Sequence, residues 1–216
     1  MAVDKVLAKN SDKAFESHPE GQYVGRCVDV IDLGEELSEF PGKPPKLVPK
    51  VALVYRTGEM NSDGVLIDLV AEFTVSLGDL ANLRHFLEQW RGKPLTEDQI
   101  KEGVPLEKME GTWALLGVAH KTSKKGRTYA IIVSAVGVPK AMAARPTFPG
   151  YERPKYLVTK VEANRKAADE YREAIGVPAG SKRLTGPGDD GDPGPTEPEP
   201  GFQDFPSDDP EDDLPF

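Results

Sequence analysis

The sequence predicts a mainly β fold with some α: a five-stranded barrel with a helix inserted between its third and fourth strands, a C-terminal helix and a disordered acidic tail. Three observations support this prediction. Several short segments of the first 140 residues are apolar, strand-like runs, and in residues 65–75 apolar and polar residues alternate with a period of two. One segment between them changes to helical spacing. Residues 185–216 hold 8 prolines, 5 glycines and no large apolar residue before Phe202, which predicts a disordered tail.

The first three strands are predicted over residues 21–31, 46–58 and 65–75. Gly25 interrupts the first segment and predicts a bulge or a sharp bend there. A Gly/Pro-rich loop, FPGKPPK, precedes the second strand, and the turn NSDG precedes the third. In the third segment apolar residues alternate with polar ones such as Asp68. We therefore expect one face of this strand to be buried and most of the other to contact water.

Helical spacing follows the third strand. Ser76 and Asp79 match an S-x-x-D capping box, and apolar residues then recur every three or four positions until Gly92 and Pro94. A short helix is also expected over residues 96–101. The sequence therefore predicts one amphipathic helix and one short helix before the fourth strand.

The last two strands are predicted over residues 111–120 and 127–136, and the loop KTSKKG joins them into a hairpin with a basic tip. Three strands, an inserted helix and a hairpin follow the order of the oligonucleotide-binding (OB) fold, a partly open five-stranded barrel. In that fold the loops after the first and fourth strands flank the ligand. We therefore predict an OB fold over residues 21–140, although an SH3-like or another small β-barrel fits the strand order nearly as well.

Three regions flank the predicted barrel. We predict a flexible N-terminal arm, a basic and aromatic extension, and a disordered acidic tail, over residues 1–20, 141–184 and 185–216. The tail carries 11 acidic residues and no Lys or Arg, whereas residues 120–183 hold 14 Lys and Arg against 5 Asp and Glu. Within the extension, a capping box at Thr159 and Glu162 predicts a helix over residues 160–175.

Binding of single strands without sequence preference needs cations along a groove and aromatic rings on which bases stack. The candidate DNA-binding residues are the strand, loop and extension residues of these types: Tyr23, Arg26, Lys50, Tyr55, Arg56, Lys121, Lys124, Lys125, Arg127, Tyr129, Arg145, Arg153 and Lys155. Tyr55 and Trp113 share strand faces with apolar residues, so both fit a core as well. Residues 144–156 place cations and rings between prolines, which suits a strip along DNA and equally a cover over the barrel.

Several motifs of residues 21–140 recur in one family. They are a G-x-Y-x-G opening strand from Gly21, a T-x-SL stretch from Thr74, an LRxFLExWRG helix end from Leu83, and a hairpin that ends near VPK. In these motifs the chain resembles the phage-type single-stranded DNA-binding proteins. The resemblance implies a non-enzymatic OB-fold protein that binds and protects single-stranded DNA of any sequence during phage replication.

The chain ends in DDLPF, an acidic cluster followed by apolar residues. This ending is similar to the acidic tip of bacterial and phage single-strand binders. The resemblance implies that the tip recruits replication or recombination proteins, such as a polymerase, a helicase or a primase, through Asp212, Asp213, Leu214, Pro215 and Phe216. We also expect the tethered tail, with its charge of −11, to compete weakly with DNA for a basic groove.

Other classes of function have weaker support in the sequence. Its three histidines match no recognised nucleophile or metal spacing, and Cys27 has no second cysteine to pair with, so we expect no cofactor and no catalysis. A metal-dependent nuclease built on Asp29, Asp32 and Asp68 is one alternative, and a protein-binding adaptor is another. Without a membrane-length apolar run or a secretory signal, a cytoplasmic protein is expected, in the host cell if the protein is viral. The sequence leaves open whether the chain forms a homo-oligomer.

Overall fold

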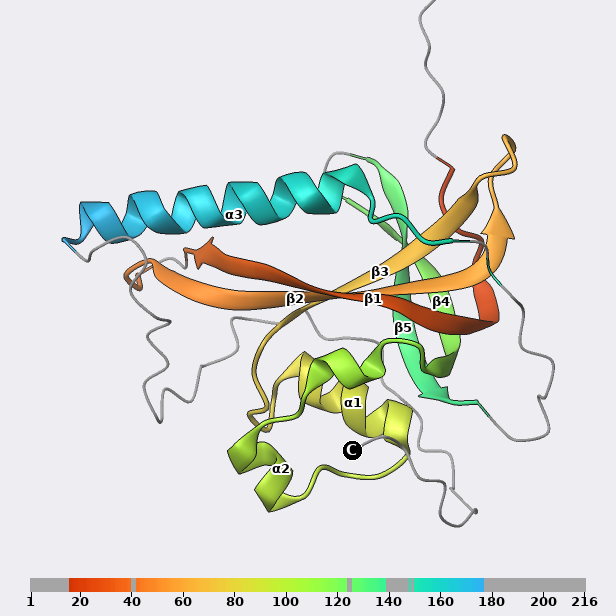
Figure 1. Ribbon diagram of the computed structural model, residues 1–216, viewed down its shortest axis with the longest axis horizontal. Helices are drawn as coiled ribbons and strands as arrows, with labels where there is room; N and C mark the ends of the chain where they lie inside the picture. The colour runs from red at the N-terminus through yellow and green to blue at the C-terminus, as the bar shows by residue number, and fades with distance from the viewer. Residues whose placement is uncertain (1–15, 40–41, 124–125, 139–147, 149, 177–216) are drawn as a thin grey trace, which may run out of the picture.

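The computed structural model describes residues 16–39, 42–123, 126–138, 148 and 150–176, and its centre is an antiparallel sheet (Figure 1). The order of the strands across the sheet is β3-β2-β1-β4-β5. Their bounds are Gly21–Ser38 for β1, Lys46–Met60 for β2, Leu66–Thr74 for β3, Trp113–Thr122 for β4 and Thr128–Gly137 for β5. Strands β3 and β5 are the edges, and no ladder joins them within the described residues, so the sheet is not closed.

Helical segments follow β3 and β5. They are α1 (Asn82–Arg91), α2 (Glu97–Glu102), the 3-10 turn η1 (Leu106–Met109) and α3 (Lys155–Ala174). The first three connect β3 to β4, and α3 follows β5. The prediction of a mainly β chain with five strands, an inserted helix and a C-terminal helix is therefore confirmed.

Strand β1 belongs to two ladders. Its residues up to Arg26 pair with β4, and those from Arg26 onward pair with β2. A bulge or a sharp bend was predicted at Gly25, and the bulge is wrong, because the ladder with β4 is regular at this point. A Cβ on Gly25 would lie 2.6 Å from Cδ1 of Leu116, so the glycine leaves room for a core side chain. The first register shift against β2 comes later, between Cys27 and Asp29.

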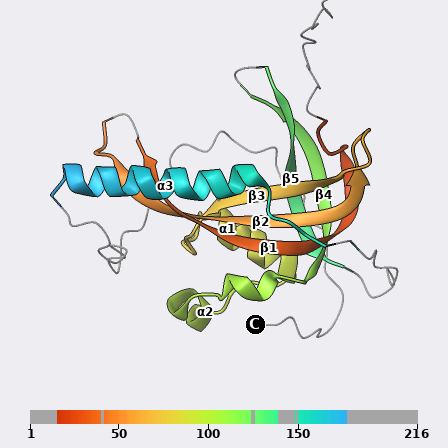
Figure 2. The ribbon, with the colours of Figure 1, turned by 45° about the horizontal axis from the view of Figure 1, so that its top comes forward.

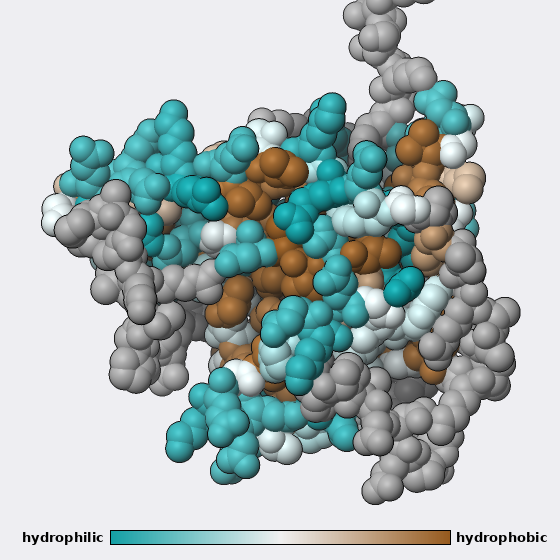
Figure 3. All heavy atoms as spheres, viewed as in Figure 1, coloured by the Kyte–Doolittle hydropathy of each residue, from teal (hydrophilic) through white to brown (hydrophobic). Residues whose placement is uncertain are grey.

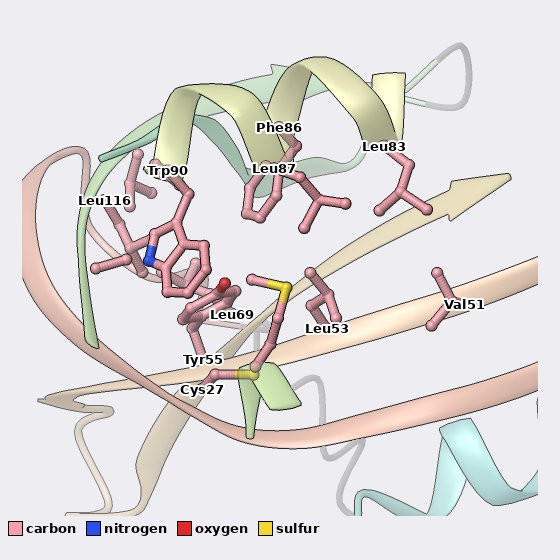
Figure 4. Close-up of a cluster of buried hydrophobic side chains, with 14 residues drawn as sticks. Cys27, Val51, Leu53, Tyr55, Leu69, Leu83, Phe86, Leu87, Trp90 and Leu116 are labelled. Atoms are coloured by element: carbon pink, nitrogen blue, oxygen red, sulfur yellow. The ribbon is translucent and has the colours of Figure 1, made fainter. Parts of the chain in front are cut away.

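The main core lies between α1 and one face of the sheet, which we call the inner face (Figure 4). Four buried side chains of α1 point toward the strands: Leu83, Phe86, Leu87 and Trp90. They meet buried residues of β1, β2, β3 and β4, which include Cys27, Leu53, Tyr55, Leu69 and Leu116. Burial of this apolar stripe is what holds α1 against the sheet.

The predicted capping box of the first helix is wrong. The N-cap of α1 is Ala81, which makes no side-chain capping bond. Ser76 Oγ instead accepts a 3.3 Å hydrogen bond from the Gly78 N–H, and Asp79 pairs with Arg84. These bonds form a polar turn ahead of the helix, so the helix begins later than the sequence pattern suggested. The short helix was predicted within one residue of α2.

Helix α3 packs on the opposite face of the sheet, which we call the outer face (Figures 1 and 2). Leu157 is fully buried there in a second core, against apolar residues of β1 and β2: Ile31, Leu33, Ala52 and Val54. The predicted start at residue 160 with a Thr159 capping box is wrong, because α3 begins at Lys155. Burial of Leu157 in the first turn explains the earlier start, since packing outweighs local capping signals.

Polar bonds hold α3 to the outer face along its length. Lys160 pairs with Glu72 of β3, and Asn164 Nδ2 donates a 2.9 Å hydrogen bond to the carbonyl of Leu33. We expected most of the second face of β3 to contact water, but α3 covers part of it. In the view of Figure 3, hydrophobic residues show at the level of the sheet, and hydrophilic residues cover α3 and α2.

The described end of the predicted N-terminal arm, residues 16–20, contacts the sheet. His18 is buried, and its Nδ1 lies 2.9 Å from the Pro19 carbonyl and its Nε2 2.7 Å from Thr57 Oγ1. His120 Nε2 donates to the His18 carbonyl at 2.7 Å. Residues 1–15 and the tail predicted over residues 185–216 lie outside the described residues.

Candidate nucleic-acid interface

Within the described residues, α3 and the segment before it do not bury the whole outer face, and part of it on β1, β4 and β5 is only half-buried. Because side chains alternate between the faces of a strand, the buried residues Ala114, Leu116 and Val118 of β4 point to the inner face. Their neighbours in β4 therefore point outward, and so do their ladder partners in β1 and β5. We call this surface the open face; it includes the half-buried Val24, Leu115, Gly117, Ala119 and Ile131 and the exposed Tyr129 and Val136.

Cations stand at both ends of the open face. Arg26 is exposed, and its Nε donates a 3.3 Å hydrogen bond to the carbonyl of Gly111. At the other end Lys121 is exposed and lies directly opposite Tyr129 in the β4–β5 ladder. Arg127, also exposed, immediately precedes β5. The structure thus brings four of the predicted residues to one surface: Arg26, Lys121, Arg127 and Tyr129.

Tyr129 supplies an aromatic ring on this surface, with 36% of its area exposed. Gly117 lies in the middle of the open face, and a Cβ there would come within 2.3 Å of Ser134 Oγ on β5. The glycine keeps β4 and β5 close and the surface low in the middle of the open face. The arrangement is a shallow apolar strip with an aromatic ring and positive charge at its ends.

Tyr55 is a core residue, one of the two roles that the sequence left open. Its side chain is 0% exposed and lies 6.3 Å, between ring centroids, from Phe86 of α1. Burial raises the pKa of its hydroxyl well above the ordinary value. The ring is therefore not available to stack on a base.

Arg56 is engaged in an ion pair and not presented to solvent. It is 6% exposed, and its Nε and Nη2 donate to both carboxylate oxygens of Asp68 at 2.7 and 2.9 Å. Its Nη1 donates to the Gly150 carbonyl at 3.3 Å, and its guanidinium carbon lies 5.3 Å from the centre of the Tyr151 ring. The hydrogen bonds to Asp68 raise the pKa of Arg56. Its role in the structure is to fasten the extension to β2.

Arg153 fastens the same segment to β1. Its Nε and Nη2 donate to the two carboxylate oxygens of Asp29 at 2.8 and 2.9 Å. We call Phe148 and residues 150–154 the crossing segment, because they lie over the outer face before α3. For these residues the structure shows a cover over the sheet, one of the two roles the sequence left open. Arg145 lies outside the described residues.

The other predicted residues lie away from the open face or outside the described residues. Tyr23 packs against the main core, and its hydroxyl donates to the Glu20 carbonyl at 3.2 Å. Lys50 Nζ donates to Thr74 Oγ1 at 3.2 Å, and Lys155 is exposed at the start of α3. Outside the described residues are Lys124, Lys125 and the tip residues Asp212, Asp213, Leu214, Pro215 and Phe216.

The candidate residues that sequence reasoning missed are the apolar ones of the open face, such as Leu115, Ala119 and Ile131. A signal for them exists, because β4 and β5 are apolar at both odd and even positions. A strand with two apolar faces needs a cover or a ligand on its second face. The sequence does not tell which of the two applies to a given strand.

The carboxylates proposed for a nuclease are already engaged. Asp29 pairs with Arg153, Asp68 pairs with Arg56, and Asp32 Oδ1 accepts a 2.9 Å hydrogen bond from the Gly34 N–H. Within the part of the chain that the structure describes, no three His, Cys, Asp or Glu residues form a group that would hold a metal ion.

Comparison of the chain with protein-family models, curated proteins and solved structures found no match. The helices of the described ranges include none with the length and apolar character needed to cross a membrane.

Proposed function

We propose that this chain binds single-stranded DNA without sequence preference and that the open face is its binding surface. The observation that carries the proposal is the placement of Arg26 at one end of a half-exposed apolar strip, and of Lys121 and Arg127 beside Tyr129 at the other. The strand order and the inserted helix also suit an OB fold, which the proposal takes as the architecture of the site.

In this proposal the cations bind phosphates and the apolar strip receives bases. Base stacking on an aromatic ring contributes about 1–3 kcal/mol per base and tolerates any sequence, because every base has a π face. The cations displace counterions from the strand, about 0.7 for each phosphate contacted, so affinity falls as salt rises. Base stacking and phosphate binding together therefore predict binding that is insensitive to sequence and sensitive to salt.

We further propose, on the sequence resemblance alone, that residues 212–216 recruit replication or recombination proteins to the DNA that the open face binds. Apolar anchors beside acidic residues suit a partner pocket lined with basic residues. A short peptide must be ordered on docking, so each such contact is expected to be modest in affinity.

The first prediction tests the open face by charge reversal. The double variant Lys121→Glu/Arg127→Glu should bind a labelled oligo(dT) at least about tenfold more weakly at low salt, since two phosphate contacts are lost. The slope of log affinity against log salt should fall by about 1.4 for the same reason. Fluorescence anisotropy across a salt series measures both quantities.

The matched control is Lys101→Glu/Lys108→Glu, which makes the same charge change at exposed positions of α2 and η1, the connection between β3 and β4. It should leave the salt slope unchanged. Equal losses in the two double variants would mean that only total charge matters, and the open face would be rejected.

Incubation of the protein with labelled single-stranded DNA and Mg²⁺, followed by gel electrophoresis, separates the classes of function. Retarded, intact DNA supports binding, and cut DNA supports a nuclease. DNA that is neither retarded nor cut supports the protein-binding adaptor.

A further inference from the structure

Trp113 lies at the Arg26 end of the open face. It is the first residue of β4, opposite Arg26 in the β1–β4 ladder, and its side chain is half-buried. Its carbonyl accepts a 3.1 Å hydrogen bond from Nε1 of the buried Trp90. Trp113 is thus an aromatic ring on the outer face whose backbone is fixed to the main core.

Phe148 of the crossing segment covers this ring. The two ring centroids are 5.9 Å apart and the ring planes are inclined by 31°. A Cβ on Gly58 of β2 would lie 3.3 Å from Cε1 of Phe148. Because β1 separates β2 from β4 in the sheet, the Phe148 ring lies above β1 at the edge of the open face.

The rest of the crossing segment is held to the sheet by residues that follow Phe148 in the chain. Arg56 holds Gly150 and Tyr151, and Asp29 holds Arg153. These charged contacts involve residues that follow Phe148 in the chain, so its ring can leave Trp113 while they stay in place. A single aromatic pair is a weaker contact than a bidentate ion pair such as that of Arg153 with Asp29.

The Trp113 position, which Phe148 covers, offers a group for the base and a group for the phosphate of a nucleotide. Trp113 offers a π face, and its ladder partner Arg26 is exposed and offers a positive charge for the phosphate. Leu115 and Val24 connect it without a break to the strip that ends at Tyr129. From Lys121 to Trp113 the strand spans about 25 Å at its usual rise per residue.

We infer that Phe148 occupies a base-stacking position on Trp113, and that a single strand of DNA long enough to cross the open face displaces Phe148 and stacks a base there. The inference rests on the proposed function of the open face. It assigns Trp113 as a second stacking residue and Phe148 as the group that competes with DNA for it. Short strands bound at the Tyr129 end do not reach this position.

The test is the variant Phe148→Ala, measured with oligo(dT) lengths from about 4 to about 16 nucleotides, the range of site sizes for one such domain. The longer oligonucleotides should bind about two- to tenfold more tightly than to the wild type, the factor expected when one competing aromatic pair is removed. The gain should be smallest for the shortest, which can use the Tyr129 end of the open face without the Trp113 position. Tyr156→Ala, which removes an exposed ring from α3 just beyond the crossing segment, should change neither.

Tryptophan fluorescence of the unmodified ring pair gives a second readout that does not depend on folding of the Phe148 variant. Trp90 is 1% exposed, so Trp113 is the tryptophan that DNA can quench in the described structure. Long oligonucleotides should quench the wild-type signal and short ones should not. Trp113→Phe should remove the length-dependent quenching.

The results separate the inference from the proposed function. If Lys121 and Arg127 are needed for binding but Phe148→Ala does not tighten binding of long strands and Trp113 is not quenched, the inference is wrong and the proposed function stands. If DNA binding does not depend on Lys121 and Arg127, the proposed function of the open face is wrong, and the inference that rests on it is rejected as well.

Discussion

Arg26 and Arg56 face each other in the β1–β2 ladder, yet their surroundings differ. Arg56 is bound by Asp68, 12 residues later in the chain, and by Gly150, 94 residues later. Arg26 is exposed beside the open face. Both are strand arginines with apolar neighbours in the sequence. Their difference comes from partners on other segments, so sequence alone treats them as equivalent.

Cys27 gives a residue-scale prediction about pH. Burial raises the pKa of its thiol from the ordinary 9.0 to about 12. Above about pH 9 the unfolded chain therefore loses this proton while the folded chain keeps it, so the free energy of unfolding falls as pH rises. Between about pH 8 and about pH 10 the wild type should lose about 1.4 kcal/mol through this group.

Urea unfolding of the wild type and of Cys27→Ala over this pH range measures the effect. The variant has no thiol to titrate, so its own loss should be smaller by that amount. The pH range ends near the ordinary pKa of tyrosine. Burial also raises the pKa of Tyr55, so at higher pH this group lowers the free energy of unfolding in the same way. Parallel curves for the two proteins would show that the thiol is not protected in the fold.

At the scale of elements, α3 and the crossing segment decide how much of the outer face is open. All of residues 51–56 in β2 are buried, because α1 lies on one side and α3 with the crossing segment on the other. The helix itself was predictable from spacing. Its position on the outer face was not, because its apolar stripe is short and suits a partner subunit as well as the sheet.

Leu157 tests the docking of α3. Because it is fully buried in the second core, Leu157→Ala should lower the free energy of unfolding by about 2–5 kcal/mol. Val158 is the next residue and is 43% exposed, so Val158→Ala should change it by no more than about 0.5 kcal/mol. Urea denaturation of both variants measures the difference. Equal, small effects would contradict the packing of α3 on the sheet.

At the scale of the whole molecule, the charge is unevenly distributed. The chain has a net charge of −9, of which residues 185–216 contribute −11. The cations of the open face lie in the remaining, slightly positive part. The proposed DNA binding therefore concerns a basic surface tethered to an acidic segment, and the total charge alone would have argued against it.

Removal of residues 185–216 tests the competition between the tail and DNA. If the tethered acidic residues compete for the open face, the truncated chain should bind oligo(dT) more tightly at low salt. The gain should shrink as salt screens the charges. Phe216→Ala keeps the tail's acidic side chains, so its DNA affinity should match the wild type in the same anisotropy assay. Unchanged or weaker binding by the truncated chain would reject competition.

The order of strands and helices, the inserted helix and the basic hairpin were determined by the sequence itself, because periodicity, turn residues and local charge act over a few neighbouring positions. Only the tertiary structure decided which apolar strand faces are covered and which cations are neutralised. Asp29 and Arg153 meet across 124 residues of sequence, and Phe148 reaches Trp113 from a segment after the hairpin. Such contacts depend on the packing of α3 and the crossing segment on the sheet, and no local pattern records them.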